Sequence, residues 1–374
     1  MSPSTNVSRE SHLADRLLHE QDINVKLSIA IEIRDSVESL TRESDFKAFV
    51  DNVLPAIMTL LRTGTVSLNS NSPDFKLRLY LMEGLHRLNQ SEPLKPHVTE
   101  LMALLLHLLR NDNEEVACLA MKIIIDLHRS FKDVLSGTVE DFLTTVKDCY
   151  RGMDAVVANL FGSSEPTETK DASKSKKPDG HSTPAASTST QTPPTPLGTQ
   201  SFKVISECPI AIVFLFQTYR EVVPQETKVF VPIIFNFLQI TPAAQFQAHQ
   251  EAEAKGEIFT QVAPSIEPFR AQFNDLLVAQ VKTMSFVAYV LRVAVAALAN
   301  YKTVLPSIVV RLLKDMPTDA VANRKELLVA QRHILATDFR NNFIPYIDVL
   351  LNDNVLIGTG TTSHETLRQL LTLR

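Results

Sequence analysis

Leu101 to Phe131 reads LMALLLHLLRNDNEEVACLAMKIIIDLHRSF, which is two apolar runs joined by a polar elbow. Aliphatic residues in each run recur at the i, i+3, i+4, i+7 spacing of a single stripe on an α-helix. Asn113 can cap the second helix, and Glu114 and Glu115 lie in its first turn, where the helix dipole favours negative charge. A hairpin of this kind cannot bury its stripes alone, so the pattern predicts that it stacks on similar neighbours.

An apolar run with an early proline recurs along the chain. Its four copies are VLPAIMTLL from Val53, FVPIIFNFL from Phe230, VLPSIVVRLL from Val304 and FIPYIDVLL from Phe343. The prolines of the last two copies, at 306 and 345, are 39 residues apart, which suits HEAT or armadillo repeats of roughly 40–47 residues. The sequence therefore predicts an all-α fold, an α-solenoid of HEAT- or armadillo-like helical hairpins, with a further hairpin beginning at Phe343.

Composition divides the chain into four segments. Residues 1–10 are polar and are expected to be disordered, residues 11–162 carry a first block of helical repeats, and residues 201–374 carry a second block. Between the blocks, residues 163–200 hold 21 Ser, Thr and Pro in 38 positions, with Leu197 as the only large apolar residue. So little apolar surface cannot offset the chain entropy, and the sequence predicts a disordered linker there.

Two further features of these segments lead to expectations. Thr183, Thr192 and Thr195 each precede a proline, which fits proline-directed kinases, although a plain linker is the simpler interpretation. The last apolar stripe, Leu367 to Leu371, is followed by no capping signal. We therefore expect the second block to be truncated at its C-terminal end.

Composition and charge argue against several classes of protein. With 10 Gly and no Trp in 374 residues, a turn-dense β fold is disfavoured. The net charge of −5 is evenly spread, so we expect no direct nucleic-acid binding. The three cysteines at 118, 149 and 208 are expected to be buried free thiols. The apolar window 285–301 contains Arg292 and is shorter than the roughly 20 residues of a membrane span, so we expect a core helix and no membrane.

The sequence lacks the signatures of an enzyme. The motifs GxxxxGK[ST], GxGxxG, HExxH and GxSxG do not occur, and Gly358-Thr-Gly360 is expected to be a turn. The ten histidines are scattered, and His128 and His333 have no neighbouring His or Cys at ligand spacing. We expect no catalytic residue, no cofactor and no metal site.

Six long segments carry a family resemblance. In order, they are SPDFKLRLYLMEGLHRL from Ser72, NDNEEVACLAMKIIIDLHRSFK from Asn111, FKVISECPIAIV from Phe202, AQVKTMSFVAYVLR from Ala279, RKELLVAQRHILATDFRNNFIP from Arg324 and VLIGTGTTSHETLRQLL from Val355. These segments resemble the N-terminal HEAT-repeat region of the TRRAP family, the pseudokinase members of the PIKK group. The similarity covers nearly the whole chain outside residues 163–200 and the first few residues, and the style of the linker suggests a fungal member.

This resemblance implies a non-catalytic nuclear scaffold. Members of the family are far longer chains that serve in SAGA-type histone acetyltransferase coactivator complexes, where they hold other subunits and receive acidic transcription activators. Two alternatives stay open: an unrelated HEAT scaffold, such as a transport receptor or phosphatase-type adaptor, and the N-terminal solenoid of an active PIKK kinase. The sequence beyond Arg374 would distinguish the second alternative.

An acidic activator with interspersed apolar residues needs an apolar groove with cations at its rim. The densest cationic helix face in the sequence is formed by Arg324, Lys325, Arg332 and Arg340, and a second pair of cations, Arg129 and Lys132, closes the opening hairpin. These six residues are the candidate activator-binding residues. The alternative interpretation is that they are ordinary solvated cations near helix C-termini.

Overall fold

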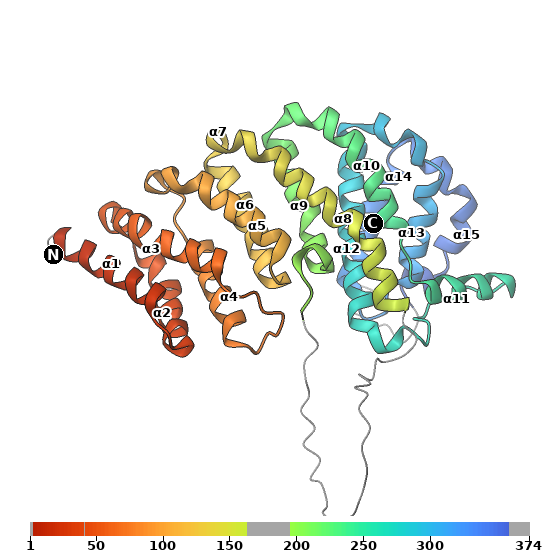
Figure 1. Ribbon diagram of the computed structural model, residues 1–374. Helices are drawn as coiled ribbons and strands as arrows, with labels where there is room; N and C mark the ends of the chain where they lie inside the picture. Colours follow the sequence, from red (N-terminus) through yellow and green to blue (C-terminus); the bar gives the residue numbers. More distant parts are fainter. Residues whose placement is uncertain (1–2, 41, 163–194, 359–374) are drawn as a thin grey trace, which may run out of the picture.

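The computed structural model describes residues 3–40, 42–162 and 195–358, with side chains described from Glu10 onward. Within these ranges the regular structure is helical throughout, apart from one isolated bridge. The helices stack in two layers to form an arch that begins at the N-terminal helix (Figure 1). The expected all-α solenoid of HEAT-like hairpins is confirmed.

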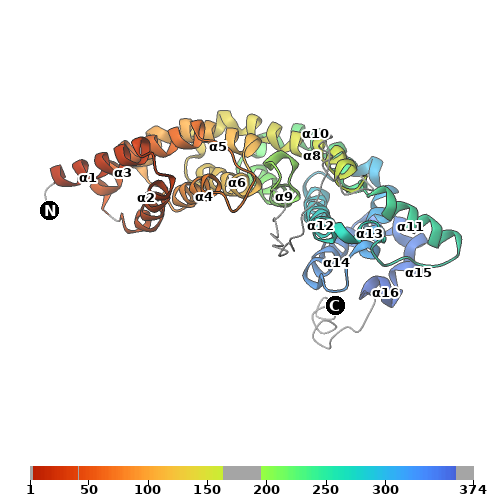
Figure 2. The same cartoon turned by 60° about the horizontal axis from the view of Figure 1, so that its bottom comes forward.

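Helices of the two layers alternate along the chain, and Figure 2 shows the inner layer on the concave side of the arch. The outer layer consists of α1 (Pro3–His19), α3 (Glu43–Thr63), α5 (Val98–Asn111), α8 (Val139–Gly162), α10 (Val223–Gln239) and α13 (Val304–Asp315). The inner layer consists of α2 (Ile23–Ser36), α4 (Pro73–His86), α6 (Glu114–Ser130), α9 (Phe202–Thr218), α12 (Arg270–Val293) and α14 (Val321–Leu335). Each inner helix packs on the inner helices before and after it, so the concave surface is continuous.

Short elements connect these hairpins. The 3-10 turns are η1 (Val37–Ser39), η2 (Glu92–His97), η3 (Ser136–Thr138), η4 (Gly198–Gln200), η5 (Arg220–Val222), η6 (Glu267–Phe269), η7 (Val295–Tyr301) and η8 (Asp338–Tyr346). The remaining α-helices are α7 (Lys132–Leu135), α11 (Ala243–Ala254), α15 (Ile347–Leu350) and α16 (Asp353–Leu356).

The opening hairpin folds as its pattern predicts. The leucines of the α5 stripe are at most 1% exposed; they are Leu101, Leu104, Leu105, Leu108 and Leu109. The side chain of Asn113 accepts a hydrogen bond from the backbone N–H of Val116 at 3.1 Å, which caps α6 as expected. The stripes of α5 and α6 belong to one apolar core that extends from Ala14 to Val355.

A buried ion pair joins the elbow of this hairpin to the preceding hairpin. Arg78 of α4 is 4% exposed, and its Nε donates to Oδ2 of Asp112 at 2.8 Å. The same guanidinium donates to the backbone carbonyl oxygens of Leu61, at 2.8 Å, and Gly64, at 3.2 Å. Because both charges are paired and hydrogen-bonded, the elbow is fixed against α3 and α4.

Two predicted boundaries of disorder were wrong. Helix α1 begins at Pro3, not at residue 11. Proline suits the first turn of a helix, and a helix already nucleated farther along extends through polar residues without an apolar stripe. The predicted linker also ends earlier than expected, because residues 195–200 are ordered against the elbow. Residues 163–194 and the stripe from Leu367 to Leu371 lie outside the described part of the chain.

We call Thr195–Gln200 the docked segment, because its backbone bonds to the elbow of the opening hairpin. The N–H of Glu114 donates to the carbonyl of Pro196 at 3.0 Å, and the N–H of Gly198 donates to the carbonyl of Asp112 at 2.8 Å. The N–H of Thr195 donates to the carbonyl of Leu68 at 2.8 Å. These bonds involve the backbone, so hydropathy did not reveal them.

The close approach of the docked segment requires a glycine. A Cβ at Gly198 would lie 2.5 Å from Cβ of Ala117 and 2.6 Å from the carbonyl oxygen of Leu109. Both distances are shorter than any normal contact, so only glycine lets the segment lie in the elbow.

The hairpin predicted from Phe343 does not form a long helix. The chain instead makes 3-10 turns through η8 and only one α-helical turn in α15. Pro345 explains the difference, because a proline disfavours the α conformation of the residue before it and removes a backbone donor. In α3 and α10 the equivalent prolines, Pro55 and Pro232, are accommodated inside the helix.

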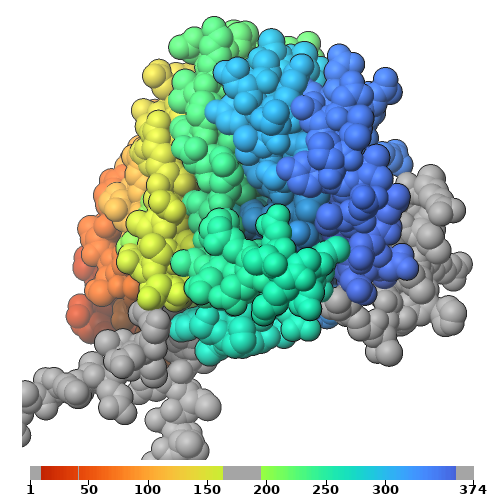
Figure 3. Space-filling model, turned by 90° about the vertical axis from the view of Figure 1, so that its right-hand side faces the viewer, coloured from red at the N-terminus to blue at the C-terminus, as the bar shows by residue number. Residues whose placement is uncertain are grey.

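Helix α11 stands out from the arch as an arm, which Figures 1 and 3 show at the lower edge of the second block. Its base is fixed because Gln245 and His249 both contact Oδ1 of buried Asp315, at 2.9 and 2.6 Å. Phe246, which lies between these two residues in the sequence, is 55% exposed.

Helix α12 contains a long apolar window. In the described part of the chain, Glu267–Val293 is the one continuous helical stretch that is long and apolar enough for a membrane span, with a mean hydropathy of 1.4. Two pairs of helices joined by sharp bends would also be long and apolar enough if each pair were one span. In the fold, α12 packs between α9 and α14, and 67% of the apolar window is buried by protein. It is therefore a core helix of the solenoid.

Candidate interaction surfaces

Arg324, the first candidate for the activator-binding face, does not lie on the surface. Its side chain is 1% exposed, and its guanidinium donates to the carbonyl oxygens of Met316 and Val355, both at 2.6 Å, and of Leu313 at 3.2 Å. Burial lowers the pKa of Arg324 to about 10. The prediction for this residue was wrong, because the arginine satisfies carbonyls at the end of α13 and holds α16 against it.

The other cations of that group remain accessible. Lys325 and Arg332 lie seven residues apart on α14, so they share one face of an inner-layer helix, and Arg332 is exposed in the last turn. Arg340 is exposed in η8, beyond the end of that helix. The structure thus brings Lys325 and Arg332 together and places Arg340 on the next element.

Arg129 lies in the last turn of α6, and Lys132 is the first residue of α7; both are exposed. The guanidinium of Arg129 pairs with Asp126 at 2.9 Å and lies over the ring of Phe214, 5.4 Å from its centroid. The ammonium of Lys132 lies 5.4 Å from the ring centroid of Tyr219. Each cation therefore covers an aromatic side chain of the neighbouring helix or its end.

A groove on the concave face includes Arg129. We call it the inner groove; it has a volume of about 520 Å³ and lies between α6, α9, α12 and α14. Its apolar surface comes from Ile125, Ile210, Val213, Phe214 and Phe286, and its charged lining residues are Arg129, Lys282 and Glu326. Ile210 is 57% exposed, which is unusual for an isoleucine in a folded core helix.

Sequence reasoning missed Ile210 and Lys282. Helix α9 is apolar on nearly every side, from Ile205 to Phe216, and a helix of that kind is covered on all faces or offers one face to a partner. The signal was therefore present in α9, but the sequence did not show which face was left open. Lys282 interrupts the apolar run of α12 and lies 3.9 Å from Glu207 of α9.

A larger opening lies at the opposite edge of the inner layer. It has a volume of about 1000 Å³ and lies between α8, the docked segment and the first turns of α9 and α12. We call it the interlayer cavity. It contains none of the six residues that the sequence suggested.

Side chains that serve other proteins as metal ligands or nucleophiles have structural roles here. In the described part of the chain, no three His, Cys, Asp or Glu side chains are placed to hold a metal ion. All three cysteines are free thiols; Cys149 and Cys208 are buried as predicted, whereas Cys118 is only partly buried. Burial raises the pKa of Cys118 and Cys149 to about 12. Thiols with such pKa values are poor nucleophiles.

His128 ties two inner helices together. Its Nδ1 lies 2.9 Å from the hydroxyl oxygen of Tyr219, and that hydroxyl donates to the carbonyl of Lys132 at 3.2 Å. The Tyr219 hydroxyl thus links the end of α6 to the end of α9. Burial lowers the pKa of His128 to about 4.

Comparison with known proteins places these surfaces in context. A family model described as the Tra1 HEAT repeat central region matches residues 272–372. The chain is 33% identical over 374 residues to the SAGA complex/NuA4 acetyltransferase complex subunit Tra1 of Schizosaccharomyces pombe, covering 97% of this chain and 10% of that protein. It is 31% identical over 368 residues to the subunit of the same description in Saccharomyces cerevisiae, covering 92% of this chain and 10% of that protein.

The similarity extends beyond fungi. The human transformation/transcription domain-associated protein is 29% identical over 353 residues, which cover 92% of this chain and 9% of that protein. The chain thus spans about a tenth of the length of the relatives it matches. The matching model is described as a central region, so the N-terminal placement of the chain stays a prediction.

Proposed function

The chain belongs to the Tra1/TRRAP family, and from this membership we propose that it is a non-catalytic scaffold segment of a nuclear histone acetyltransferase coactivator complex. The observation that carries the proposal is the similarity along 97% of the chain to a protein named as a SAGA and NuA4 complex subunit. The resemblance found in the sequence is confirmed by these matches.

The architecture supports a scaffold. A two-layer solenoid offers a long concave surface whose shape is set by a continuous core, and such surfaces commonly hold other proteins. The relatives carry acetyltransferase-subunit or transcription-associated names, which favours this role over a transport receptor, a phosphatase adaptor or the solenoid of an active kinase.

A chimera tests the proposal. The matching tenth of S. pombe Tra1 is replaced by this chain, and the tagged chimera is purified and assayed for histone acetyltransferase activity. A scaffold segment of the same family should restore activity that a deletion of the segment loses. A stable, soluble chimera that recovers no more activity than the deletion would overturn the proposal.

For recognition of acidic activators we propose the inner groove and the cations along the concave face. Arg129 contributes to the rim of the groove, and Lys325 and Arg332 extend the cationic face along α14. Lys132 and Arg340 lie farther out on neighbouring elements. The buried Arg324 is not part of this surface.

Charge reversal tests the activator proposal. Arg129→Glu, Lys325→Glu and Arg332→Glu together should weaken pull-down by an acidic activation domain at least about tenfold, because cations steer and hold an anionic partner. A matched control reverses exposed cations away from the concave face, at Lys47 and Lys228. Equal pull-down by the two folded variants would count against the inner groove.

A further inference from the structure

The interlayer cavity offers a second binding site, separate from the inner groove. Its first wall is the second half of α8, from Asp148 to Leu160. The second wall is the docked segment, and the third comes from Phe202 at the start of α9 and Phe269 at the end of η6. Because these walls come from distant parts of the sequence, the cavity exists only in the folded solenoid.

Gly152 keeps this cavity wide. It lies near the middle of the 24-residue helix α8 and lines the cavity. A Cβ at this position would meet nothing closer than the carbonyl oxygen of Thr199, at 3.9 Å, so packing does not require a glycine. Glycine inside a helix costs roughly 0.5–1 kcal/mol relative to alanine. The glycine at position 152 therefore makes the helix less stable than alanine would, and it leaves space for a ligand.

The charges that line the cavity are mostly negative. They are the carboxylates of Glu114, Asp148 and Asp275 and the ammonium of Lys203, which sum to −2. Glu114 is fully occupied, because Oε1 accepts from Lys203 Nζ and Oε2 accepts from Ser201 Oγ, both at 2.7 Å. Lys203 is held in this way at one side of the cavity.

Asp275 is the carboxylate left over. It is partly buried in the second turn of α12, and in the described part of the chain it makes no hydrogen bond or ion pair. Burial raises its pKa above the ordinary value, although Lys203 acts in the opposite direction. A carboxylate in a largely apolar cavity is stabilised when a cation joins it.

We propose that the interlayer cavity binds a lysine or arginine side chain of a partner protein, presented on a segment with apolar residues on either side. The cation lies against Asp275, because Asp148 is exposed and already pairs with Arg151 at 3.0 Å. The apolar neighbours pack on Phe202 and Phe269. The proposal goes beyond the scaffold role and does not depend on which complex contains the chain.

An anionic partner fits the cavity less well. The N-terminus of α9, which lies at the cavity, is already capped, because Ser201 Oγ accepts from the N–H groups of Lys203 and Val204 at 3.1 and 3.3 Å. Glu114 and Glu115 both pair with Lys203, at 2.7 and 3.3 Å. The cation that lines the cavity, Lys203, therefore already has two anionic partners, and Asp275 would repel an added anion.

Binding of labelled synthetic hexapeptides to the 374-residue chain tests the proposal by fluorescence anisotropy. The probes alternate leucine with lysine, leucine with glutamate, and glycine with lysine. The leucine–lysine peptide should bind at least about tenfold more tightly than either other peptide. Asp275→Asn should weaken its binding about tenfold, because one charge pair at a partly desolvated site is lost.

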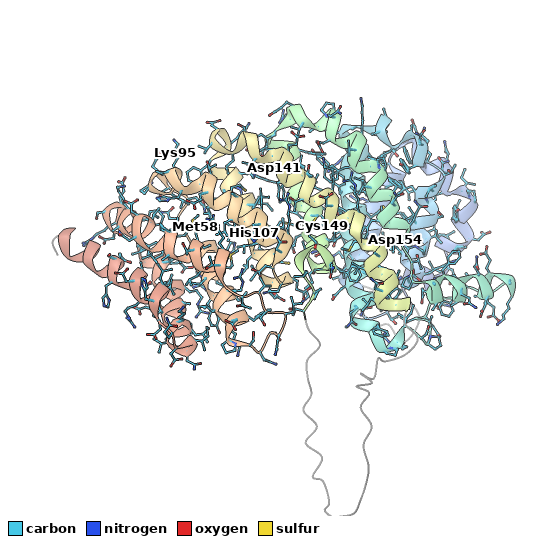
Figure 4. All side chains as sticks on the ribbon, viewed as in Figure 1. Met58, Lys95, His107, Asp141, Cys149 and Asp154 are labelled. Atoms are coloured by element: carbon cyan, nitrogen blue, oxygen red, sulfur yellow. The ribbon has the colours of Figure 1, made fainter. Side chains whose placement is uncertain are left out.

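Two further variants make the experiment specific to the cavity. Gly152→Leu fills the cavity and should abolish binding, with circular dichroism and a thermal melt confirming the fold. Asp154→Asn removes a charge from the exposed side of α8, where Figure 4 labels the residue, and should leave binding unchanged. Preference for the leucine–glutamate peptide, binding unaffected by Asp275→Asn and Gly152→Leu, or no binding of the leucine–lysine peptide would each overturn the proposal.

Discussion

Acidification should weaken the fold through His128. The side chain is fully buried in α6, and in the described part of the chain its Nε2 has no hydrogen-bond partner. A proton added to Nε2 would therefore be a buried charge without an acceptor, which is why burial lowers the pKa of His128 to about 4.

The sign follows from the direction of this pKa shift. The unfolded chain, with a histidine pKa of 6.5, binds a proton at pH values where the folded chain does not. The contribution of His128 is therefore absent above about pH 7, and the free energy of unfolding falls as the pH drops from about 6.5 toward about 4. At 1.36 kcal/mol per pKa unit, the loss is about 3 kcal/mol in full and about 2 kcal/mol at pH 5.

Urea unfolding at pH 7.5 and pH 5.0 measures this loss. Other groups titrate in the same interval, so the informative quantity is the difference between wild type and His128→Gln, whose amide keeps a donor for Tyr219 without titrating. The variant should lose about 2 kcal/mol less than wild type between the two pH values. His107→Gln, an exposed histidine on α5 that is labelled in Figure 4, is the matched control.

Hydrogen exchange at both pH values then locates the effect, because solenoids can open in segments. The amides of α6 and α9 should lose protection on acidification in wild type and keep more of it in His128→Gln. Equal pH-dependent losses in wild type and His128→Gln would refute the reasoning. So would a loss relieved to the same extent by His107→Gln.

Three other substitutions test the packing. Gly198→Ala should lower the free energy of unfolding by about 1–3 kcal/mol in a thermal melt, because a Cβ would lie 2.5 Å from Cβ of Ala117. The control Gly137→Ala should have little effect, because a Cβ there would meet nothing within 4 Å. Similar melting temperatures for the two would contradict this. Asp112→Asn should cost about 3–5 kcal/mol in urea unfolding, since it leaves buried Arg78 without a counter-charge; a loss below about 1 kcal/mol would show the pair to be dispensable. Gly152→Ala should raise the free energy of unfolding by about 0.5–1 kcal/mol, and a lower melting temperature would show that the position is not open.

The helical hairpins were predictable because the apolar residues and caps that define each helix lie close together in the sequence. The spacing from Leu101 to Leu109 specifies one buried face, and Asn113 specifies the start of α6, so two helices and their junction follow from adjacent residues. The recurring runs from Val53, Phe230 and Val304 then predicted a series of such units.

Features that depend on backbone contacts between distant segments were not predictable. The docked segment is poor in apolar residues and is held by hydrogen bonds to Asp112, Glu114 and Leu68, which no periodicity records. Pro345 replaced an expected helix by 3-10 turns, although Pro55 is tolerated inside α3. Whether a proline breaks a helix depends on the packing around it.

The candidate surface was predictable only in part. Arg129, Lys325 and Arg332 lie on helices of the concave layer, but Arg324 is buried. It was predicted to lie on the surface only because charged residues are mostly exposed. The buried arginine pairs with carbonyls that belong to two other helices. Such partners emerge only from the packed fold.

We propose that an intact solenoid in this segment holds acetyltransferase subunits in the complex. The most direct test is the amount of acetyltransferase catalytic subunit recovered per molecule of the Tra1 chimera, measured by quantitative mass spectrometry with and without Ile124→Asp. Ile124 is 0% exposed in the core of α6, so a buried aspartate there disrupts the stacking of the hairpins. We expect full recovery with the intact chimera and a marked loss with Ile124→Asp. Equal recovery from both would contradict it.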